Sequence, residues 1–243
     1  MEKNEIYSDL RTIPPVFVRV DGRGFHRLAQ DLQLIRPFDP RFCRAMADVC
    51  TSFLTESGLT PRFAYTFSDE ISLYFPDLPF DGRVEKIDSV CASFAASALT
   101  LALRCTHAIA FDARIIPVPA PMVRQYLTGR QAEAWRNHIN ATCQDTLVRE
   151  GMNATEAAAF LKGRTSPQLH ELMFSRGMNL AKAPAWQRRG VLVRRQGALK
   201  KGHNPVTGDD VFVERHVVQV LMDLPLFSSP EGSDLLGSLL GEV

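Results

Sequence analysis

The sequence lacks the features that define several specialised classes of protein. Its five cysteines contain no CxxC pair and are odd in number, which excludes a zinc ribbon and argues against a disulfide framework. We expect them to be reduced thiols packed in helices. An excess of charge of one sign is also missing, because 28 lysines and arginines face 27 acidic residues and the formal net charge is +1 at pH 7. This balance excludes a uniformly basic nucleic-acid coat, while it still allows a local basic patch.

Long hydrophobic runs are absent as well. Residues 1–5 are rich in charge and lead into no apolar segment, so we expect no secretory signal. The most apolar stretch, 90–103, is too short to span a bilayer and predicts a buried helix. With 243 residues and 45% hydrophobic content, the chain is expected to be a soluble, cytoplasmic globular protein with no membrane partner.

The spacing of apolar residues in the first half predicts the order β-α-β-β-α-β, which is the ferredoxin-like unit, and therefore an α+β fold. Strands are expected at 15–20, 63–67, 71–75 and 108–116, and helices at 41–54 and 84–103.

The second half changes to a helical pattern that ends in two returning strands. Helices are expected at 122–127, 130–150, 154–161 and 167–174, strands at 190–194 and 211–220, and a loop at 200–210. We expect residues 1–120 to form the core domain. Residues 121–243 are then a helical elaboration with returning strands, packed with the core as one compact unit.

Two short acidic motifs stand where predicted strands end. Asp21 follows the first strand, and Asp69 and Glu70 form the turn between the second and third. In the ferredoxin-like order these ends lie on one edge of the sheet, so the carboxylates are expected to be neighbours. Two divalent ions about 4 Å apart need such carboxylates, which favours metal-dependent phosphoryl transfer. For Glu70 a ligand role, an outer supporting role and a plain turn role all remain open.

Residues suited to phosphate binding surround the first motif. Gly22 and Gly24 let the backbone approach a phosphate, and His26 follows at a suitable distance. Arg83 and Lys86 stand at the start of a predicted helix, where cations and free N–H groups can receive a triphosphate. A basic segment further along predicts either a solvated strand or, beside a catalytic site, an RNA contact. Its residues are Arg188, Arg189, Arg194, Arg195, Lys200 and Lys201.

With these motifs the sequence resembles the tRNA-His guanylyltransferase superfamily, whose members add nucleotides in the 3′-to-5′ direction. Residues 19–28, RVDGRGFHRL, and 67–70, FSDE, are similar to the two metal motifs of the family, and residues 137–140 and 171–175 to later segments. The resemblance covers nearly the whole chain. It implies a core like a polymerase palm with a helical C-terminal elaboration, and a homotetramer.

The resemblance also implies roles for individual residues. Asp21, Asp69 and the Gly22 carbonyl would bind two Mg²⁺ ions, with Glu70 assisting as a catalytic carboxylate. Arg83 and Lys86 would hold the ATP or GTP that activates the 5′ end. The other implied nucleotide contacts are Gly22, Arg23, Gly24, Phe25, His26 and Ser68 at the triphosphate and Arg36 and Asp39 near the base. His138 and Asn140 are implied RNA contacts, in addition to the basic segment.

One departure from the family pattern shapes the functional prediction. Members that add the extra guanosine to tRNA-His carry a longer HINNLYN-type motif, whereas residues 138–144 here read HINATCQ. The leading hypothesis is therefore a Mg²⁺-dependent, template-directed 3′-to-5′ nucleotidyltransferase that repairs tRNA 5′ ends after ATP or GTP activation. The alternatives are a tRNA-His guanylyltransferase, a nucleotide cyclase, and an RNA-binding protein with an inactive palm. Fold analogy alone does not separate them.

Overall fold

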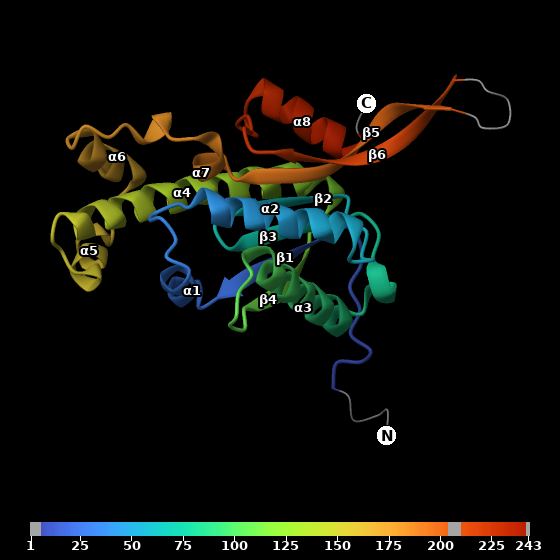
Figure 1. The fold of residues 1–243 in the computed structure, drawn as a ribbon, viewed down its shortest axis with the longest axis horizontal. Coiled ribbons are helices and arrows are strands. Elements are labelled where there is room, and N and C mark those ends of the chain that lie inside the picture. Colours follow the sequence, from blue (N-terminus) through green and yellow to red (C-terminus); the bar gives the residue numbers. More distant parts are fainter. Residues whose placement is uncertain (1–5, 204–209, 242–243) are drawn as a thin grey trace.

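A computed structural model describes residues 6–203 and 210–241, and its centre is a six-stranded antiparallel sheet in the order β4-β1-β3-β2-β5-β6 (Figure 1). The strands are β1 (Val16–Arg23), β2 (Phe63–Phe67), β3 (Glu70–Phe75), β4 (Ala110–Pro117), β5 (Val191–His203) and β6 (Asp210–Leu221). The first four make the ferredoxin-like unit, and β5 and β6 continue the sheet beyond β2.

Helices cover both faces of the sheet, and α5 and α6 lie beyond one end of it (Figure 1). The helices are α1 (Phe25–Asp31), α2 (Pro40–Thr55), α3 (Val84–Leu103), α4 (Val123–Arg149), α5 (Ala154–Leu161), α6 (Ser166–Phe174), α7 (Ala185–Arg189) and α8 (Pro230–Leu240). Short 3₁₀ turns occupy Pro79–Gly82, Ala120–Met122 and Leu180–Lys182.

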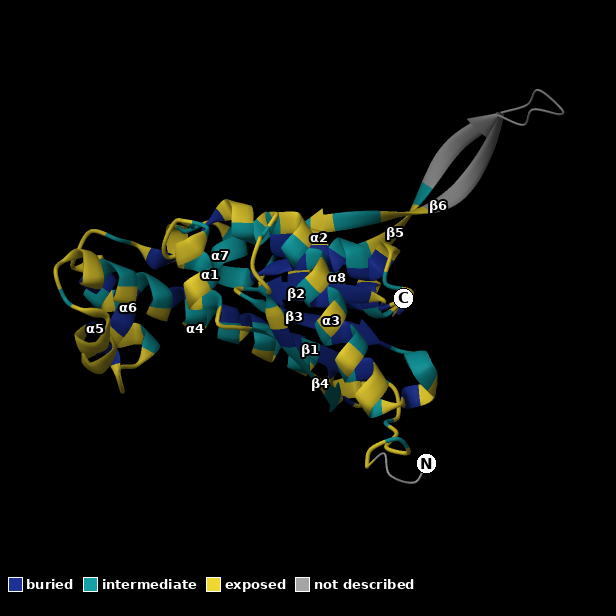
Figure 2. Cartoon of the chain, turned by 60° about the horizontal axis from the view of Figure 1, so that its bottom comes forward, coloured by how far each residue is buried: buried dark blue, intermediate teal, exposed yellow. Residues whose placement is uncertain are grey.

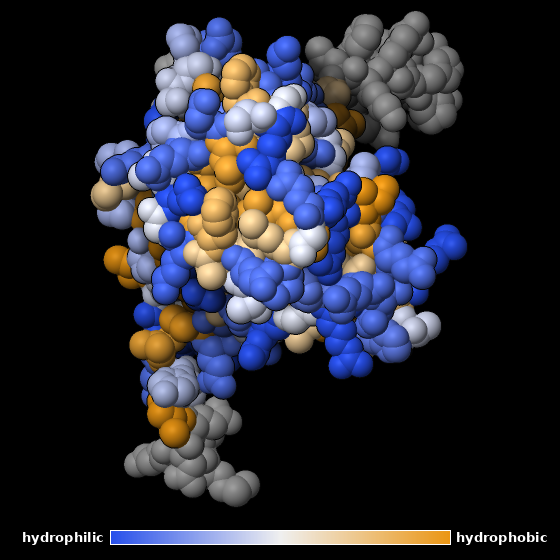
Figure 3. Space-filling view, turned by 90° about the vertical axis from the view of Figure 1, so that its left-hand side faces the viewer, coloured by the Kyte–Doolittle hydropathy of each residue, from blue (hydrophilic) through white to orange (hydrophobic). Residues whose placement is uncertain are grey.

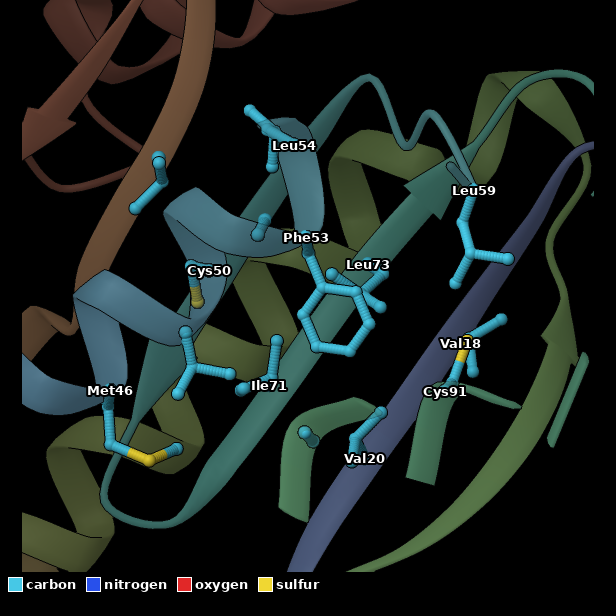
Figure 4. Packing of buried hydrophobic residues seen from close by; sticks show 14 of the residues in the cluster. Val18, Val20, Met46, Cys50, Phe53, Leu54, Leu59, Ile71, Leu73 and Cys91 are labelled. Atoms are coloured by element: carbon cyan, nitrogen blue, oxygen red, sulfur yellow. The ribbon is translucent and has the colours of Figure 1, made fainter. Parts of the chain in front are cut away.

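Strict alternation along β1 divides the core between the two faces of the sheet. Val16, Val18 and Val20 lie in the cluster formed with α2 and α3, where Figure 4 shows Phe53 of α2 packed over the strands. Burial of this apolar surface is the main favourable term in folding, and Figure 2 shows the central strands β1, β2 and β3 as largely buried. The intervening residues, including Asp21, therefore face the opposite side of the sheet.

The opposite face is covered by α4 and α8. Phe17 and Tyr74 pack there with Leu127 of α4 and Leu236 of α8. The far half of α4 leaves the sheet and forms a third cluster with α5 and α6. Figure 3 views the molecule from this end and shows apolar side chains gathered near the middle of the face, framed by hydrophilic ones.

Helix α3 is the one described helix that is long and apolar enough to cross a membrane by length and composition. Its buried residues recur every four positions, at Ile87, Cys91, Ala95 and Leu99, and they join the sheet cluster. A core helix passes the same test, so this single helix is weak evidence for a membrane span.

The α+β, palm-like fold class is confirmed, and the differences from the sequence prediction are local. Helix α4 runs unbroken through Gly129, where two helices were expected, because its packing on the sheet and on α5 and α6 outweighs the roughly 1 kcal/mol cost of one glycine. Helices α1, α7 and α8 were not predicted. Strands β5 and β6 extend to His203 and from Asp210, so the expected loop 200–210 is shorter, and its part at 204–209 lies outside the described residues. All five cysteines are free thiols, as expected, but Cys105 lies just after α3 and not in a helix.

Candidate active site

Three carboxylates form a row across neighbouring strands at one edge of the sheet. Asp21 of β1 lies directly opposite Glu70 of β3 on one side and Asp112 of β4 on the other. Directly opposed residues share a face of an antiparallel sheet, and for Asp21 this is the face covered by α4. The sequence prediction that Asp21 and the second motif are neighbours is therefore confirmed by the register.

Asp69 lies in the turn that joins β2 and β3. The backbone carbonyl of Asp69 accepts a hydrogen bond of 3.1 Å from the Gly22 N–H, and the Ser68 hydroxyl donates to the Asp69 carboxylate at 3.0 Å. Ser68 has a φ of 52°, a left-handed conformation of the kind that clusters at functional sites. Burial raises the pKa of Asp69, and the nearby negative charge of Asp21 raises it further. The turn thus holds a carboxylate whose charge is poorly compensated.

Glu70 is tied to helix α4 by a buried ion pair. Its Oε2 atom lies 2.7 Å from Arg130 of α4 and 3.8 Å from Arg19 of β1, and its side chain is 12% exposed. Burial raises the pKa of Glu70, while Arg130 and Arg19 oppose that shift. The other oxygen, Oε1, is buried and has no hydrogen-bond partner. Among the open roles for Glu70, the ion pair with Arg130 favours the supporting one, which stays a prediction.

The segment Gly22–Gly24, which includes the last two residues of β1 and the N-cap of α1, is shaped by one aromatic ring. A Cβ on Gly22 would lie 2.3 Å from a ring carbon of Phe25, and Phe25 is itself packed edge-on against Phe42 and Phe111. Gly24 has a φ of 71° and open space around it. Gly22 is thus required by close packing and Gly24 by backbone conformation. Phe25, which is predicted as a nucleotide contact, also packs against this segment and restricts its backbone.

We expect Gly22→Ala to cost about 1–3 kcal/mol of unfolding free energy, as overpacking does, and Phe25→Leu to recover part of that loss. The same Phe25→Leu change in a Gly24→Ala background should bring no recovery, because only Gly22 meets the ring. Urea unfolding of the single and double variants measures both cycles. Equal coupling in the two backgrounds would contradict the role assigned to Phe25.

A cavity of about 640 Å³ opens beside the acidic turn, between α1, α2, α4 and α7. Five of the predicted nucleotide contacts line it, namely Phe25, His26, Arg36, Asp39 and Ser68, and so does the predicted metal ligand Asp69. Its volume falls in the range of cofactor sites. The cavity therefore provides a place for a nucleotide next to the carboxylates.

Asp39 is held firmly in the wall of this cavity. It caps α2 by accepting from the Arg41 N–H at 2.7 Å, and it also accepts from the Ile35 N–H and the Arg41 guanidinium. The Arg41 hydrogen bond in particular lowers the pKa of Asp39 to about 2. His26 and Arg36 lie 3.5 Å apart at the rim. The hydrogen bonds of Asp39 therefore stabilise the wall of the cavity.

Arg83 and Lys86 are not brought to this edge. Arg83 caps the start of α3, beside Thr12, whose N–H donates to Gly82, and these residues stand at the end of the sheet where β1 begins. Helix α3 has 20 residues, which corresponds to about 30 Å at 1.5 Å per residue, and it runs from there toward β4. Within one chain these two cations lie far from Asp21, and their contact with the activating nucleotide stays a prediction.

His138 is corrected from an RNA contact to a buried residue. It is 2% exposed and stacks between the rings of Phe38 and Trp135, with centroids 5.2 and 5.6 Å away. Burial lowers its pKa to about 4. The face of α4 that carries it points into the protein, whereas Asn140 is exposed and donates to the Arg136 carbonyl.

The buried His138 predicts a pH dependence of stability. Its folded-state pKa of about 4 lies below the unfolded value of 6.5, so the unfolded chain binds more protons between these values. The free energy of unfolding is therefore not reduced by His138 above about pH 6.5. As the pH falls to about 4, protonation of His138 in the unfolded chain lowers the free energy of unfolding by about 2–3 kcal/mol. We expect His138→Phe, which keeps the stacked ring, to flatten this part of the profile. Urea unfolding from pH 4 to 7 checks it, and identical slopes would contradict it.

The arginines of the basic segment are used within the protein. Arg188 donates to the Ala183 carbonyl, Arg189 to the Leu224 carbonyl, Arg194 to Gln219, and Arg195 to the Leu54 carbonyl. These bonds tie α7 and β5 to their surroundings and leave fewer donors for phosphate. The Lys200 and Lys201 side chains lie outside the described residues. RNA contact by this segment stays a prediction.

Three residues of the site were missed from the sequence: Arg130, Asp112 and Arg114. Arg114 lies 2.9 Å from Asp112 and 4.0 Å from Asp21. A signal existed for two of them, because Asp112 and Arg114 alternate along a predicted edge strand, and pairing that strand with β1 in register places them beside Asp21. For Arg130 no local signal existed, since its contact depends on where α4 crosses the sheet.

The donors present fit a hard divalent cation such as Mg²⁺. Asp21 and Asp69 supply carboxylate oxygens, and Glu70 has one buried oxygen without a partner. In the part of the chain that the structure describes, no three His, Cys, Asp or Glu side chains are grouped closely enough to hold a metal by themselves. Mg²⁺ sites that share their ion with substrate phosphates use only one or two carboxylates, so the donor set agrees with that type of site.

Fold and site together define a palm-like α+β protein with paired carboxylates beside a nucleotide-sized cavity. Residues 1–119 match the family model described as tRNAHis guanylyltransferase, and residues 121–217 match the Thg1 C-terminal domain. The chain belongs to the tRNA-His guanylyltransferase superfamily, a group of nucleotidyltransferases.

Individual relatives agree with this assignment. The chain is 29% identical over 184 residues to tRNA(His) guanylyltransferase 1 of Arabidopsis thaliana, a match that covers 71% of this chain and 32% of that protein. It is 28% identical over 195 residues to the probable tRNA(His) guanylyltransferase of Drosophila melanogaster, covering 76% and 68%. The chain thus spans about a third of the first relative's length and about two thirds of the second's.

The fold is shared with a bacterial tRNA(His) guanylyltransferase-like protein in complex with ATP. The TM-score is 0.75 at 23% identity, and the match covers 100% of this chain and 96% of the other. This likeness concerns the fold.

Proposed function

We propose that the protein is a metal-dependent nucleotidyltransferase that adds nucleotides to the 5′ end of tRNA. The observation that carries the proposal is the convergence of Asp21 and Asp69 at one sheet edge, with the 640 Å³ cavity opening beside Asp69. The names of the family relatives supply the substrate, since both relatives are named as tRNA(His) guanylyltransferases.

The chemistry would run in two displacements at the same site. In the first, an oxygen of the tRNA 5′ phosphate attacks the α-phosphorus of ATP or GTP, and pyrophosphate leaves. In the second, the 3′-OH of the incoming nucleotide attacks the activated 5′ phosphate, and the nucleoside monophosphate leaves. Both steps build negative charge on phosphoryl oxygens, so catalysis depends on positioning and on electrostatic stabilisation.

Different residues of this chain would bind the metal ions, bind the triphosphate and position the acidic turn. Asp21, Asp69 and the Gly22 carbonyl would hold Mg²⁺ ions, which when bound neutralise the phosphoryl oxygens and the leaving group. The segment Gly22–Gly24 and Ser68 would place backbone N–H and hydroxyl donors at the triphosphate. Glu70, fixed by Arg130, would keep the acidic turn in register with β1.

Between the two tRNA activities, the names of the relatives favour addition of the guanosine to tRNA-His. Template-directed 5′-end repair, the leading sequence hypothesis, is kept as a second candidate on one observation. The segment Ala141 to Gln144 replaces the second half of the family motif, and Cys143 within it is buried in the α4–α5–α6 cluster.

One assay separates these activities and the cyclase alternative. Labelled nucleotide is offered with full-length tRNA-His, with a tRNA lacking its first 5′ nucleotide, or with no RNA, each with Mg²⁺ or EDTA. Metal-dependent labelling of full-length tRNA-His supports guanylyl addition, and extension of the truncated tRNA supports repair. A cyclic product without RNA, or RNA binding with no incorporation, would overturn the proposal.

A further inference from the structure

One cation sits directly beside the proposed metal ligand. The Nη2 atom of Arg114 lies 2.9 Å from Asp112 Oδ1 and 4.0 Å from Asp21 Oδ2. A single nitrogen therefore serves two carboxylates of the same row, with the shorter contact to Asp112. The sheet register fixes this arrangement, because Asp112 lies opposite Asp21 and Arg114 follows two residues later on the same face.

The contact between Arg114 and Asp21 balances negative charge in the site. Asp69 and Glu70 are both partly buried near Asp21, and its charge raises the pKa of each. Glu70 has its own arginines, whereas Arg114 is the cation that contacts Asp21 among the described ion pairs. An arginine stays protonated at every relevant pH, so it offers permanent compensation that a metal ion must replace.

We propose that Arg114 is an internal counter-cation of Asp21 and that Asp112 restrains it, so that the two positioning residues set the affinity of the metal site. Asp112 holds the guanidinium at hydrogen-bond distance and keeps its contact with Asp21 long. A metal ion then displaces Arg114 from Asp21 easily, and Asp112 retains the displaced cation. This inference rests on the metal site of the proposed function.

The two residues should act on metal affinity in opposite directions. Arg114→Gln removes the competitor and is expected to tighten Mn²⁺ binding about three- to tenfold, the size expected for one charge about 6 Å from a divalent ion near the surface. Asp112→Asn frees Arg114 to pair closely with Asp21 and is expected to weaken binding by a similar factor.

A double-mutant cycle separates contact from a general charge effect. If Arg114 competes by contact, Arg114→Gln tightens binding at least threefold more in the Asp112→Asn background than in the wild type. If only the field of the charges matters, the two effects are independent. Arg44→Gln is the control, because Arg44 is an exposed arginine of α2 that does not line the cavity and has no ion pair among the described contacts. It should change Mn²⁺ affinity by less than about twofold.

The experiment is a Mn²⁺ titration followed by electron paramagnetic resonance, on the full chain, with and without a non-hydrolysable GTP analogue. Opposite shifts with the stated coupling support the inference. Independent effects, or an Arg114→Gln effect no larger than that of Arg44→Gln, would overturn it and leave the proposed function intact. Failure of the wild type to bind Mn²⁺ under both conditions would overturn the metal assignment, and with it this inference.

Discussion

Asp69→Asn is expected to lower the rate of nucleotide addition by about a thousandfold or more without destabilising the protein. A carboxylate that holds a catalytic metal supports several kcal/mol of transition-state stabilisation, and each 1.36 kcal/mol is a factor of about ten in rate. Stability should hold or rise, because burial and Asp21 both disfavour the charged form of Asp69 and raise its pKa. Single-turnover incorporation and urea unfolding measure the two quantities.

The matched control for this prediction is Asp48→Asn, which removes an exposed carboxylate of α2. It should leave both rate and stability near the wild-type values. Asp21→Asn should behave like Asp69→Asn. If Asp69→Asn retained full activity, or if its activity fell only in step with its stability, the assignment of this carboxylate as a metal ligand would be wrong.

Arg130→Met should be the most destabilising of the charge substitutions, at about 3 kcal/mol. It removes the closest partner of Glu70 and leaves a carboxylate of 12% exposure with only the 3.8 Å contact to Arg19. Breaking one side of a buried pair typically costs about 3–5 kcal/mol, and the remaining Arg19 contact places the expected value at the lower end. Urea unfolding at pH 7 gives the free energy directly.

Two comparisons make this second prediction specific. Arg136→Met, on the same helix, breaks an exposed pair with Glu133 and should cost less than about 1 kcal/mol. Adding Glu70→Gln to Arg130→Met removes the unpaired charge and should return much of the loss. An Arg130→Met effect as small as that of Arg136→Met would show that the pair does not anchor the acidic turn to α4.

The part of the site that depends on sheet topology could be predicted from the sequence. A β-α-β-β-α-β order leaves one way to place Asp21 and Asp69 at the same edge, and the observed register follows it. The same order also places Arg83 away from that edge. Strand β3 runs from the acidic turn to the end of the sheet where β1 begins, and α3, whose N-cap is Arg83, follows it there.

Side-chain contacts between distant elements were beyond the sequence prediction. The pairing of Glu70 with Arg130 spans 60 residues and depends on the angle at which α4 crosses the sheet. The burial of His138 has the same origin, since the helical period identifies a face but not what covers it. The bonds of Arg188 and Arg195 to backbone carbonyls were equally hidden, because a run of cations gives no indication of internal acceptors.

The most direct test of the central claim is a template exchange in the nucleotide-addition assay. The nucleotide opposite the vacant 5′ position of a tRNA is changed in turn to each of the four bases, and the labelled nucleotide incorporated in the presence of Mg²⁺ is identified. A nucleotidyltransferase that acts on tRNA 5′ ends is expected to incorporate a nucleotide. The incorporated base should follow the template base if the activity is repair, and it should be guanosine with every template if the activity is guanylyl addition. No incorporation with any of the four tRNAs, by wild-type protein that binds Mn²⁺ and nucleotide, would contradict it.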